Sequence, residues 1–241
     1  MRFDIITLFP EMFAPFLQSG INRRAFEVQA DGSKLVDVRF TNPRDFADGN
    51  YRRVDDRPFG GGPGMLMMAE PLMRSIEAVR AERNQTHAGT VPVVLFSPIG
   101  EKLNHALVAQ FADAKQTHSG AILVCGRYEG IDQRFIDTCI TQQISLGDFV
   151  LSGGEIAAIA FLDAVARLQP GVLGDAQSHV QDSFNPALGG LLDCPHYTRP
   201  EVWRGHQVPD VLLSGNHALI DAWRTLERHK LTQQLRPDLL L

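Results

Sequence analysis

Short apolar runs that stop at glycine or proline recur along the first two thirds of the chain. Two early runs, residues 3–9 and 35–40, predict strands that end at prolines. Three later runs each continue into a loop containing glycine or proline and then into a helical pattern, and they span residues 91–96, 121–125 and 143–146. Strands that alternate with helices predict an α/β fold with a largely parallel sheet.

The pattern changes after Arg167. A Gln-Pro-Gly sequence breaks the preceding helix, and the stretch that follows is polar, which is typical of a linker. Farther on, Ser214 predicts the start of a helix that runs through Arg228 with one apolar face. The sequence therefore predicts a large domain, a linker and a small helical domain over residues 1–173, 174–190 and 191–241.

Composition places the chain among globular proteins, because 44% of its 241 residues are hydrophobic and 21% are charged. Its three cysteines form no CxxC pair, which favours free thiols over disulfides or a structural zinc site. It has no signal-peptide pattern, and no stretch approaches about 18 apolar residues. We therefore expect a soluble, cytoplasmic protein with no membrane partner.

Charge alone does not define a partner. The net charge of −5 argues weakly against a non-specific nucleic-acid coat, although it permits a local basic face. The tail from Pro195 carries five arginines, one lysine and four of the eight histidines. These side chains suit either RNA phosphates or a solvated helix face.

Several common motifs are absent from the sequence: GxxxxGK[ST], GxGxxG, HExxH and GxSxG. Since ligands of parallel sheets bind beyond the carboxyl ends of the strands, we expect a site among the three glycine-containing loops instead. Tight turns are the alternative explanation for those glycines. Residues 55–65 form a further glycine-rich segment, in which two prolines favour a binding loop over a flexible tether.

The helix that begins near Gly154 is apolar on most sides. Glu155, Asp163 and Arg167 share one stripe, and the last two stand four residues apart. An exposed pair at this spacing is worth about 0.3–0.5 kcal/mol and is the ordinary interpretation. The pattern alone therefore assigns no chemistry to these residues.

Taken together, eight motifs in a fixed order resemble one family, the bacterial tRNA (guanine-N1)-methyltransferases of the TrmD type in the SPOUT superfamily. The resemblance covers nearly the whole chain. Its motifs are ITLFPEMF, VDDRPFGGGPGMLM, LVCGRYEGID, SLGDFVLSGGE, RLQPGVLG, QDSF, LLDCPHYTRPEVW and VPDVLLSGNH.

The resemblance implies a deep trefoil knot that holds S-adenosylmethionine, and knots are rare exceptions among folds. It also implies a homodimer whose sites are shared between the knot of one subunit and the linker and C-terminal domain of the other. The residues implied to contact the donor are Ser97, Pro98, Gly126, Tyr128, Glu129, Leu146, Gly147, Asp148, Phe149, Val150, Leu151, Gly153 and Gly154.

The substrate that the resemblance implies is guanosine 37 of tRNA, next to the anticodon. Asp182 is then the general base that removes the proton from guanine N1, and Arg167 stabilises charge on the guanine oxygen or orients Asp182. Asp55 and Arg57 help to hold the guanine or the RNA. The family's dependence on Mg²⁺ leads to no metal ligands that spacing can assign.

Two positions depart from the family pattern. Phe149 replaces a tyrosine that is common there, and the linker at Asn185 to Gly190 is somewhat extended relative to the family pattern. Two alternatives remain, a non-catalytic RNA-binding protein and a SPOUT enzyme that methylates a ribose or a ribosomal base. The presence of both Asp182 and Arg167 argues against the first, and the VDDRPFGGGPGM loop and C-terminal motifs argue against the second.

Overall fold

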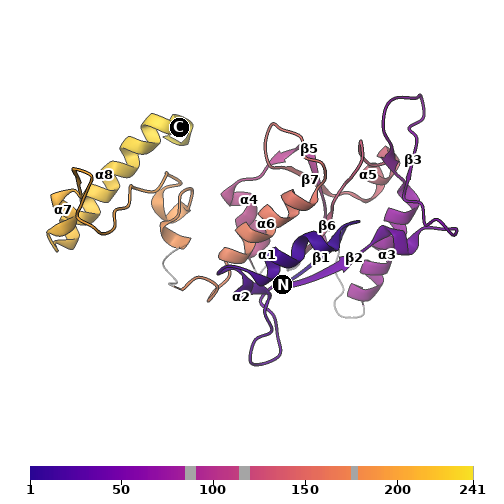
Figure 1. Ribbon diagram of the computed structural model, residues 1–241, viewed down its shortest axis with the longest axis horizontal. Coiled ribbons are helices and arrows are strands. Elements are labelled where there is room, and N and C mark those ends of the chain that lie inside the picture. The colour runs from indigo at the N-terminus through magenta and orange to yellow at the C-terminus, as the bar shows by residue number, and fades with distance from the viewer. Residues whose placement is uncertain (85–90, 114–119, 175–178, 241) are drawn as a thin grey trace. The chain divides into compact units, whose positions relative to one another are not determined.

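The computed structural model in Figure 1 describes residues 1–84, 91–113, 120–174 and 179–240. The chain divides into two compact units, Met1–Leu173 and Gly174–Leu241, and each is considered by itself. Part of the predicted linker, residues 175–178, lies outside the described residues. Across the described ranges, no helix combines the length and apolar character needed to cross a membrane.

The first unit is built on a five-stranded sheet in the order β2-β1-β6-β5-β7, with every neighbouring pair parallel. This confirms the predicted α/β fold with a largely parallel sheet. In chain order the strands are β1 (Arg2–Ile6), β2 (Asp37–Thr41), β5 (Val93–Lys102), β6 (Gly120–Val124) and β7 (Gln142–Ser145).

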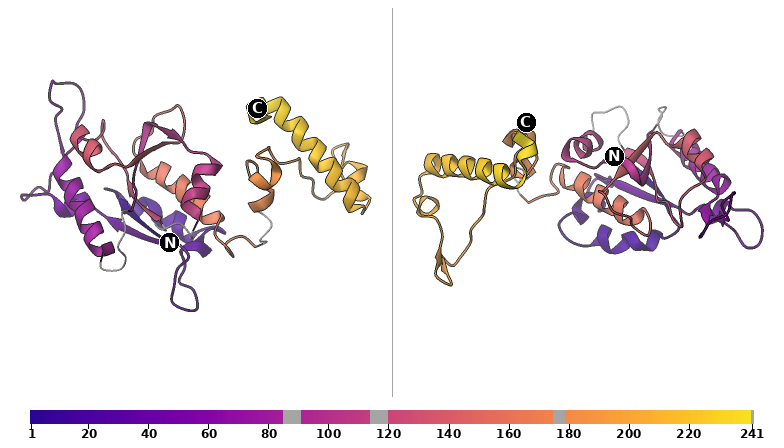
Figure 2. Two further views of the ribbon diagram at one scale, coloured as in Figure 1. Left: turned by 180° about the vertical axis from the view of Figure 1, so that it is seen from behind. Right: turned by 90° about the horizontal axis from the view of Figure 1, so that it is seen from above.

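Helices cover both faces of this sheet (Figures 1 and 2). The helices of the first unit are α1 (Ala14–Gln18), α2 (Arg23–Phe26), α3 (Ala69–Asn84), α4 (His105–Ala112), α5 (Gln133–Cys139) and α6 (Glu155–Arg167), with short 3₁₀ helices at Pro10–Phe13 and Pro43–Phe46. Successive strand residues point to opposite faces, and β1, β5 and β6 carry buried apolar side chains on both. One face packs against α4 and α6, and the other against α3 and α5.

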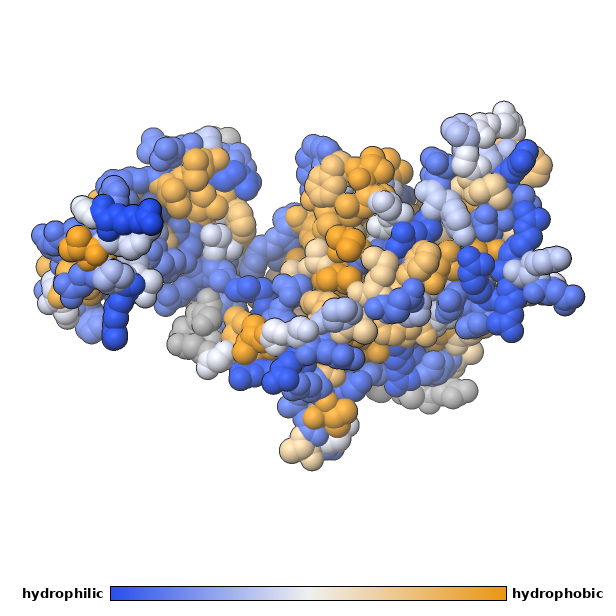
Figure 3. All heavy atoms as spheres, viewed as in Figure 1, coloured by the Kyte–Doolittle hydropathy of each residue, from blue (hydrophilic) through white to orange (hydrophobic). Residues whose placement is uncertain are grey.

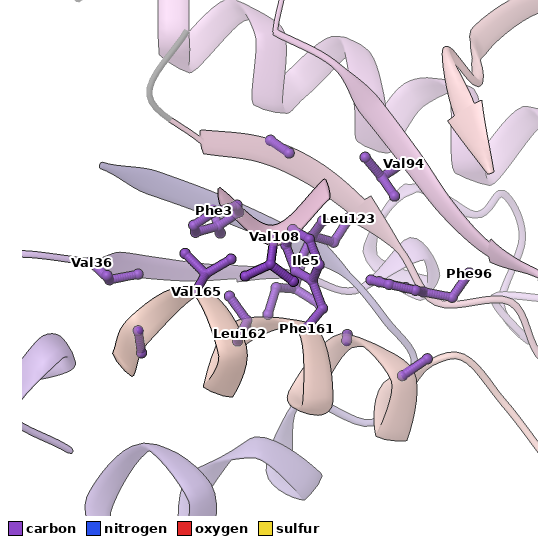
Figure 4. Close-up of a cluster of buried hydrophobic side chains, with 14 of the residues drawn as sticks. Phe3, Ile5, Val36, Val94, Phe96, Val108, Leu123, Phe161, Leu162 and Val165 are labelled. Carbon is purple, nitrogen blue, oxygen red and sulfur yellow. The ribbon is translucent and has the colours of Figure 1, made fainter. Parts of the chain in front are cut away.

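Phe161 of α6 stands at the centre of the first of these two cores (Figure 4). Its ring makes edge contacts with Phe3 and Phe111 at centroid distances of 5.8 and 5.0 Å, and it packs on Phe96 at 5.9 Å. Aromatic pairs in these arrangements add to the stabilisation that burial gives. They fix α6 against β1 and β5, and hence the start of α6 against the strand ends.

The segment after Phe96 differs from the expected loop. Residues 97–100 lie inside β5, which continues to Lys102 along β7. The register with β7 shifts there, since Phe96 and Glu101 both pair with Ile144 of β7. Such a bulge leaves residues unpaired and accommodates Pro98, whose nitrogen cannot donate to a neighbouring strand.

The glycine-rich loop closes a small hairpin. Its strands are β3 (Asp55–Asp56) and β4 (Leu66–Met67), which pair antiparallel. Four of the loop glycines have positive φ angles between 79° and 123°, a region that other residues rarely occupy. The backbone N–H of Met67 donates to the Gly130 carbonyl at 2.8 Å, which ties the hairpin to the segment after β6.

The second unit contains a hairpin of β8 (Val202–Trp203) and β9 (His206–Gln207), followed by α7 (Asp210–Leu213) and α8 (His217–Leu235), with 3₁₀ helices at His179–Gln181, Pro186–Leu188 and Pro237–Leu240. The predicted bounds of its long helix were wrong at both ends. Asn216 caps α8 by accepting a hydrogen bond from Leu219 N–H, whereas Ser214 ends α7. The helix then runs past Arg228 to Leu235.

Candidate active site

A pocket of about 240 Å³ lies around the carboxyl ends of β6 and β7 and the bulge of β5. Apolar side chains of the strands and helices form much of its surface, including Leu95, Ile131, Ile144 and Ala157. Eleven of the thirteen residues implied to contact the donor line it: Ser97, Pro98, Gly126, Tyr128, Glu129, Leu146, Phe149, Val150, Leu151, Gly153 and Gly154.

One wall of the pocket is the segment that follows β6. Its Glu129 N–H donates to the Met65 carbonyl of the glycine-rich hairpin at 2.9 Å. Tyr128 adopts a left-handed backbone with a φ of +60°, which is uncommon for an aromatic residue. Such a backbone persists where surrounding contacts fix it, so the hairpin and this wall support each other.

The Tyr128 hydroxyl connects this wall with Asp55, one of the two residues expected to hold the substrate. Burial, and next the Asp55 carboxylate, raises the pKa of Tyr128, while Arg44 acts in the opposite direction. The hydroxyl is therefore neutral near neutral pH and available as a donor to the carboxylate. Asp55 thus lies next to the pocket.

Arg57 lies at a different place, just after β3. It lines a second hollow of about 580 Å³, together with Phe59, Asp132 and side chains of α3 and α5. Phe59 is almost fully exposed at the tip side of the hairpin. The structure therefore separates Arg57 from the lining of the first pocket while it brings Asp55 to Tyr128.

The segment between β7 and α6 forms the opposite wall. Gly154, the residue before α6, donates its N–H to the Gly126 carbonyl at 3.0 Å, which joins the two walls through backbone. A Cβ atom at Gly154 would lie 2.8 Å from Cα of Cys125, closer than real side chains come to backbone. Glycine is therefore required here by close backbone approach.

Two of the implied donor contacts, Gly147 and Asp148, do not line the pocket. Gly147 makes the turn after β7, with a φ of +156°, and its N–H donates to the Ser145 hydroxyl at 3.1 Å. Asp148 points to a surface ion pair in which Lys102 Nζ lies 2.8 Å from its carboxylate. Both residues thus shape the wall without facing the cavity.

The two residues expected to perform the chemistry belong to different units. Arg167 is the half-buried last residue of α6 in the first unit, and Asp182 is half-buried in the second unit. Asp163, which shares a helix face with Arg167, accepts a hydrogen bond from the side-chain amide of Asn22.

The backbone around Asp182 forms a compact loop. Asp182 N–H donates to the His179 carbonyl at 3.4 Å, and Phe184 N–H donates to the Leu191 carbonyl at 2.9 Å. The linker segment Asn185 to Gly190, extended relative to the family pattern, contains the 3₁₀ helix Pro186–Leu188, where Asn185 accepts from Ala187 N–H. The following residues then return to Asp193, whose N–H donates to the Ser183 hydroxyl at 2.9 Å.

Sequence reasoning missed two charged residues at the pocket. Arg127 lines it, and the side chain of Glu155 is fully buried beside Arg127. Both stood inside quoted motifs, yet only their contact across the fold distinguishes them from neighbouring residues. The feature of the sequence that could have indicated a role for Glu155 is its position in the first turn of a mostly apolar helix.

Among the described residues, Asp193, Cys194 and His196 form a group whose potential ligand atoms lie within 4.8 Å of one another. The carboxylate of Asp193 already contacts His196 Nε2 at 2.7 Å and accepts from Cys194 N–H. Burial, and next the Asp193 carboxylate, raises the pKa of the Cys194 thiol, which disfavours the thiolate that binds metals. The Asp193 carboxylate is therefore already engaged by its neighbours.

The basic side chains of the C-terminal tail are largely matched by acids. Arg224 pairs with Asp221, Lys230 with Glu227 and Arg236 with Asp238. Such pairs support the solvated-face interpretation for most of α8. Outside it, Arg204 lies over the exposed ring of Trp203 at 5.1 Å.

The fold and pocket define the class: an α/β protein with a small-ligand site at the carboxyl ends of parallel strands, formed by glycine-rich segments without a phosphate-binding loop. The model of the family described as tRNA (Guanine-1)-methyltransferase TrmD matches residues 1–241. The chain belongs to this family.

Individual relatives agree with the family match. Three of them are named tRNA (guanine-N(1)-)-methyltransferase. The relative from a Polaromonas species is 68% identical over 240 residues, covering 100% of this chain and 89% of its own length. Those from Albidiferax ferrireducens and Burkholderia ambifaria are 66% and 52% identical, with 100% of this chain and 92% and 87% of theirs covered.

Proposed function

We propose that this protein transfers a methyl group from S-adenosylmethionine to N1 of the guanosine at position 37 of tRNA. The observation that carries the proposal is the pocket at the carboxyl ends of β6 and β7, found in a chain whose family and named relatives are tRNA (guanine-N1)-methyltransferases. A tRNA substrate also favours a cytoplasmic location, where tRNA is modified.

The pocket suits the methyl donor, and we assign donor binding to the residues that line it. Leu95, Ile131 and Ala157 offer apolar surface to an adenine ring, and backbone groups of the two glycine-rich walls offer hydrogen bonds. The donor has no phosphate, which agrees with the absence of a phosphate-binding motif. When bound, it supplies a methyl group already activated on a sulfonium.

The protein must then align the guanine and remove its N1 proton. We assign removal of this proton to Asp182, since a carboxylate is a suitable general base. Such a base contributes about 10²–10⁴-fold to the rate. Arg167 carries a permanent, planar charge that stabilises negative charge growing on the guanine oxygen. Asp55, beside Tyr128, and Arg57 hold the guanosine or the adjacent RNA.

We further propose that the active protein is a homodimer with a trefoil knot in residues 1–173, and that residues 174–190 and 191–241 serve as linker and tRNA-binding domain. Ile99 and Val150 are more than four-fifths exposed, and Phe149 and Ile156 are about half exposed. Figure 3 shows apolar side chains gathered over this end of β5. Exposed apolar surface of this kind supports burial against a second copy.

Binding measurements with the full chain test the donor assignment. We expect calorimetry to detect S-adenosylmethionine and S-adenosylhomocysteine, and no binding of NAD or ATP. Repeating the titration with Mg²⁺ tests whether the metal acts on donor binding, since we assign it no ligands. Tight ATP binding with no response to S-adenosylmethionine would contradict the proposed function.

A further inference from the structure

A charged pair is buried directly behind the donor pocket. Glu155 begins α6, and its side chain has 0% exposure to solvent. The Thr7 hydroxyl, just beyond β1, donates to its Oε1 at 2.8 Å. Arg127, in the segment after β6, places Nε 2.9 Å from Oε2. Three distant parts of the sequence therefore meet at one carboxylate.

Arg127 extends this contact to both walls of the pocket. It lines the cavity itself, and its Nη1 donates to the Ser152 carbonyl at 3.3 Å. Its Nη2 contacts Met12 Sδ at 3.1 Å, and the guanidinium lies over the Phe9 ring, 4.4 Å from the centroid. The Arg127 side chain thus links the wall after β6, to which it belongs, with the N-terminal segment and with the wall between β7 and α6.

The wall between β7 and α6 is packed against this pair with no spare room. A Cβ atom at Gly153 would contact the Arg127 side chain and would lie 2.6 Å from Oε2 of Glu155. Gly153, which lines the pocket together with Ser152 and Gly154, is therefore in close contact with both members of the pair.

Stability does not account for such a pair. Removing two charges from water costs several kcal/mol per ion, and well-packed apolar residues often do as well or better. Specific geometry is what a rigid guanidinium with several directed contacts provides. The location of these contacts, on both walls of one pocket, indicates which geometry is being fixed.

We propose that Thr7, Glu155 and Arg127 form a positioning unit that sets the spacing of the two pocket walls and so determines affinity for the methyl donor. The inference rests on the proposed function, because it takes the pocket's ligand to be S-adenosylmethionine. Glu155 and Thr7 act through Arg127 and the backbone of residues 152–154, without touching the donor.

Glu155→Gln tests this role because it keeps the size of the side chain and removes its charge. We expect the Kd for S-adenosylhomocysteine, measured by calorimetry well below the melting temperature, to rise at least tenfold. The KM for S-adenosylmethionine should rise more than kcat falls, since a binding interaction is lost. The Kd for tRNA should stay within twofold of wild type.

A matched control lies in β1, just before Thr7. Asp4 in β1 is also a buried carboxylate, and it pairs with Arg2 and Arg83 away from the pocket lining. We expect Asp4→Asn to lower the melting temperature while leaving the Kd for S-adenosylhomocysteine within twofold. If Asp4→Asn weakens donor binding as much as Glu155→Gln does, the pair has only a general structural role and the proposal is wrong.

A double variant covers the case in which Glu155→Gln does not fold. Arg127→Met with Glu155→Leu replaces the pair by apolar side chains and is expected to fold. It should still bind S-adenosylhomocysteine at least tenfold more weakly, because the contact with Ser152 is gone. Wild-type affinity in either folded variant would overturn the inference, whereas failure of the wild-type chain to bind would refute the proposed function instead.

Discussion

Asp182 is the residue on which the proposed chemistry depends most. Its carboxylate belongs to a compact loop held by backbone hydrogen bonds to His179 and Leu191. We expect Asp182→Asn to keep this loop, since asparagine has the same shape. Transfer should fall roughly 10²–10⁴-fold, as for loss of a general base, while calorimetry should find donor binding unchanged.

A control variant separates this role from a general effect of removing an acid from the second unit. Asp221→Asn, which alters an exposed acid of α8 paired with Arg224, serves as the control and should behave as wild type. Near-normal single-turnover rates in Asp182→Asn at saturating tRNA and donor would show that the base lies elsewhere.

The backbone contact between the segment after β6 and the start of α6 shapes the pocket. We expect Gly154→Ala to weaken binding of S-adenosylhomocysteine, because its Cβ would meet Cys125 backbone and push the walls apart. Crowding of this kind typically costs about 1–3 kcal/mol of stability as well. Calorimetry and thermal melting measure the two effects.

Gly174 provides the comparison for that substitution. A Cβ atom there would meet nothing within 4 Å, and its backbone does not require glycine. Gly174→Ala should therefore leave donor affinity and melting temperature close to wild type. Equal donor affinity in the two alanine variants would contradict the close approach inferred at Gly154.

Much of the sheet could be predicted from the sequence, because short apolar runs between turns report strands buried on both faces. The bulge in β5 could not be predicted, because a proline such as Pro98 normally ends a strand. Only the pairing with β7 shows that the strand continues past it. The start of α8 was also ambiguous locally. Ser214 and Asn216 are both good capping residues, and the left-handed turn at Gly215 decides between them.

The candidate site could likewise be predicted from the sequence only in part. Glycine-rich loops at strand ends pointed to the pocket, and the motifs supplied the residues that line it. The buried contact between Arg127 and Glu155 depends on β6 and α6 meeting in space, so neither periodicity nor spacing predicts it. Asp148 was placed among the donor contacts for its motif, whereas Lys102 holds it at the surface.

For the whole molecule, the separation of Arg167 and Asp182 into two units leads to a test of the shared site. Each of the variants Arg167→Ala and Asp182→Ala should be inactive alone. Mixed chains should regain activity, because each heterodimer then holds one intact site made from two subunits. The readout is methyl transfer after mixing, with each variant alone as control.

The mixing experiment also has an outcome that excludes a shared site. If mixed chains stay inactive while sedimentation shows that heterodimers form, the two residues act within one subunit. Full activity of a wild-type monomer at working dilution would equally contradict the proposed dimer.

The reaction proposed for this protein is methylation of one ring nitrogen in one nucleotide of tRNA. The most direct measurement is transfer of labelled methyl from S-adenosylmethionine into a tRNA transcript with guanosine at position 37, with identification of the modified nucleoside by mass spectrometry. We expect N1-methylguanosine at position 37 and no transfer into a matched transcript with adenosine there. Equal transfer into both transcripts, or a methyl group on a ribose or another base, would rule out the proposed reaction.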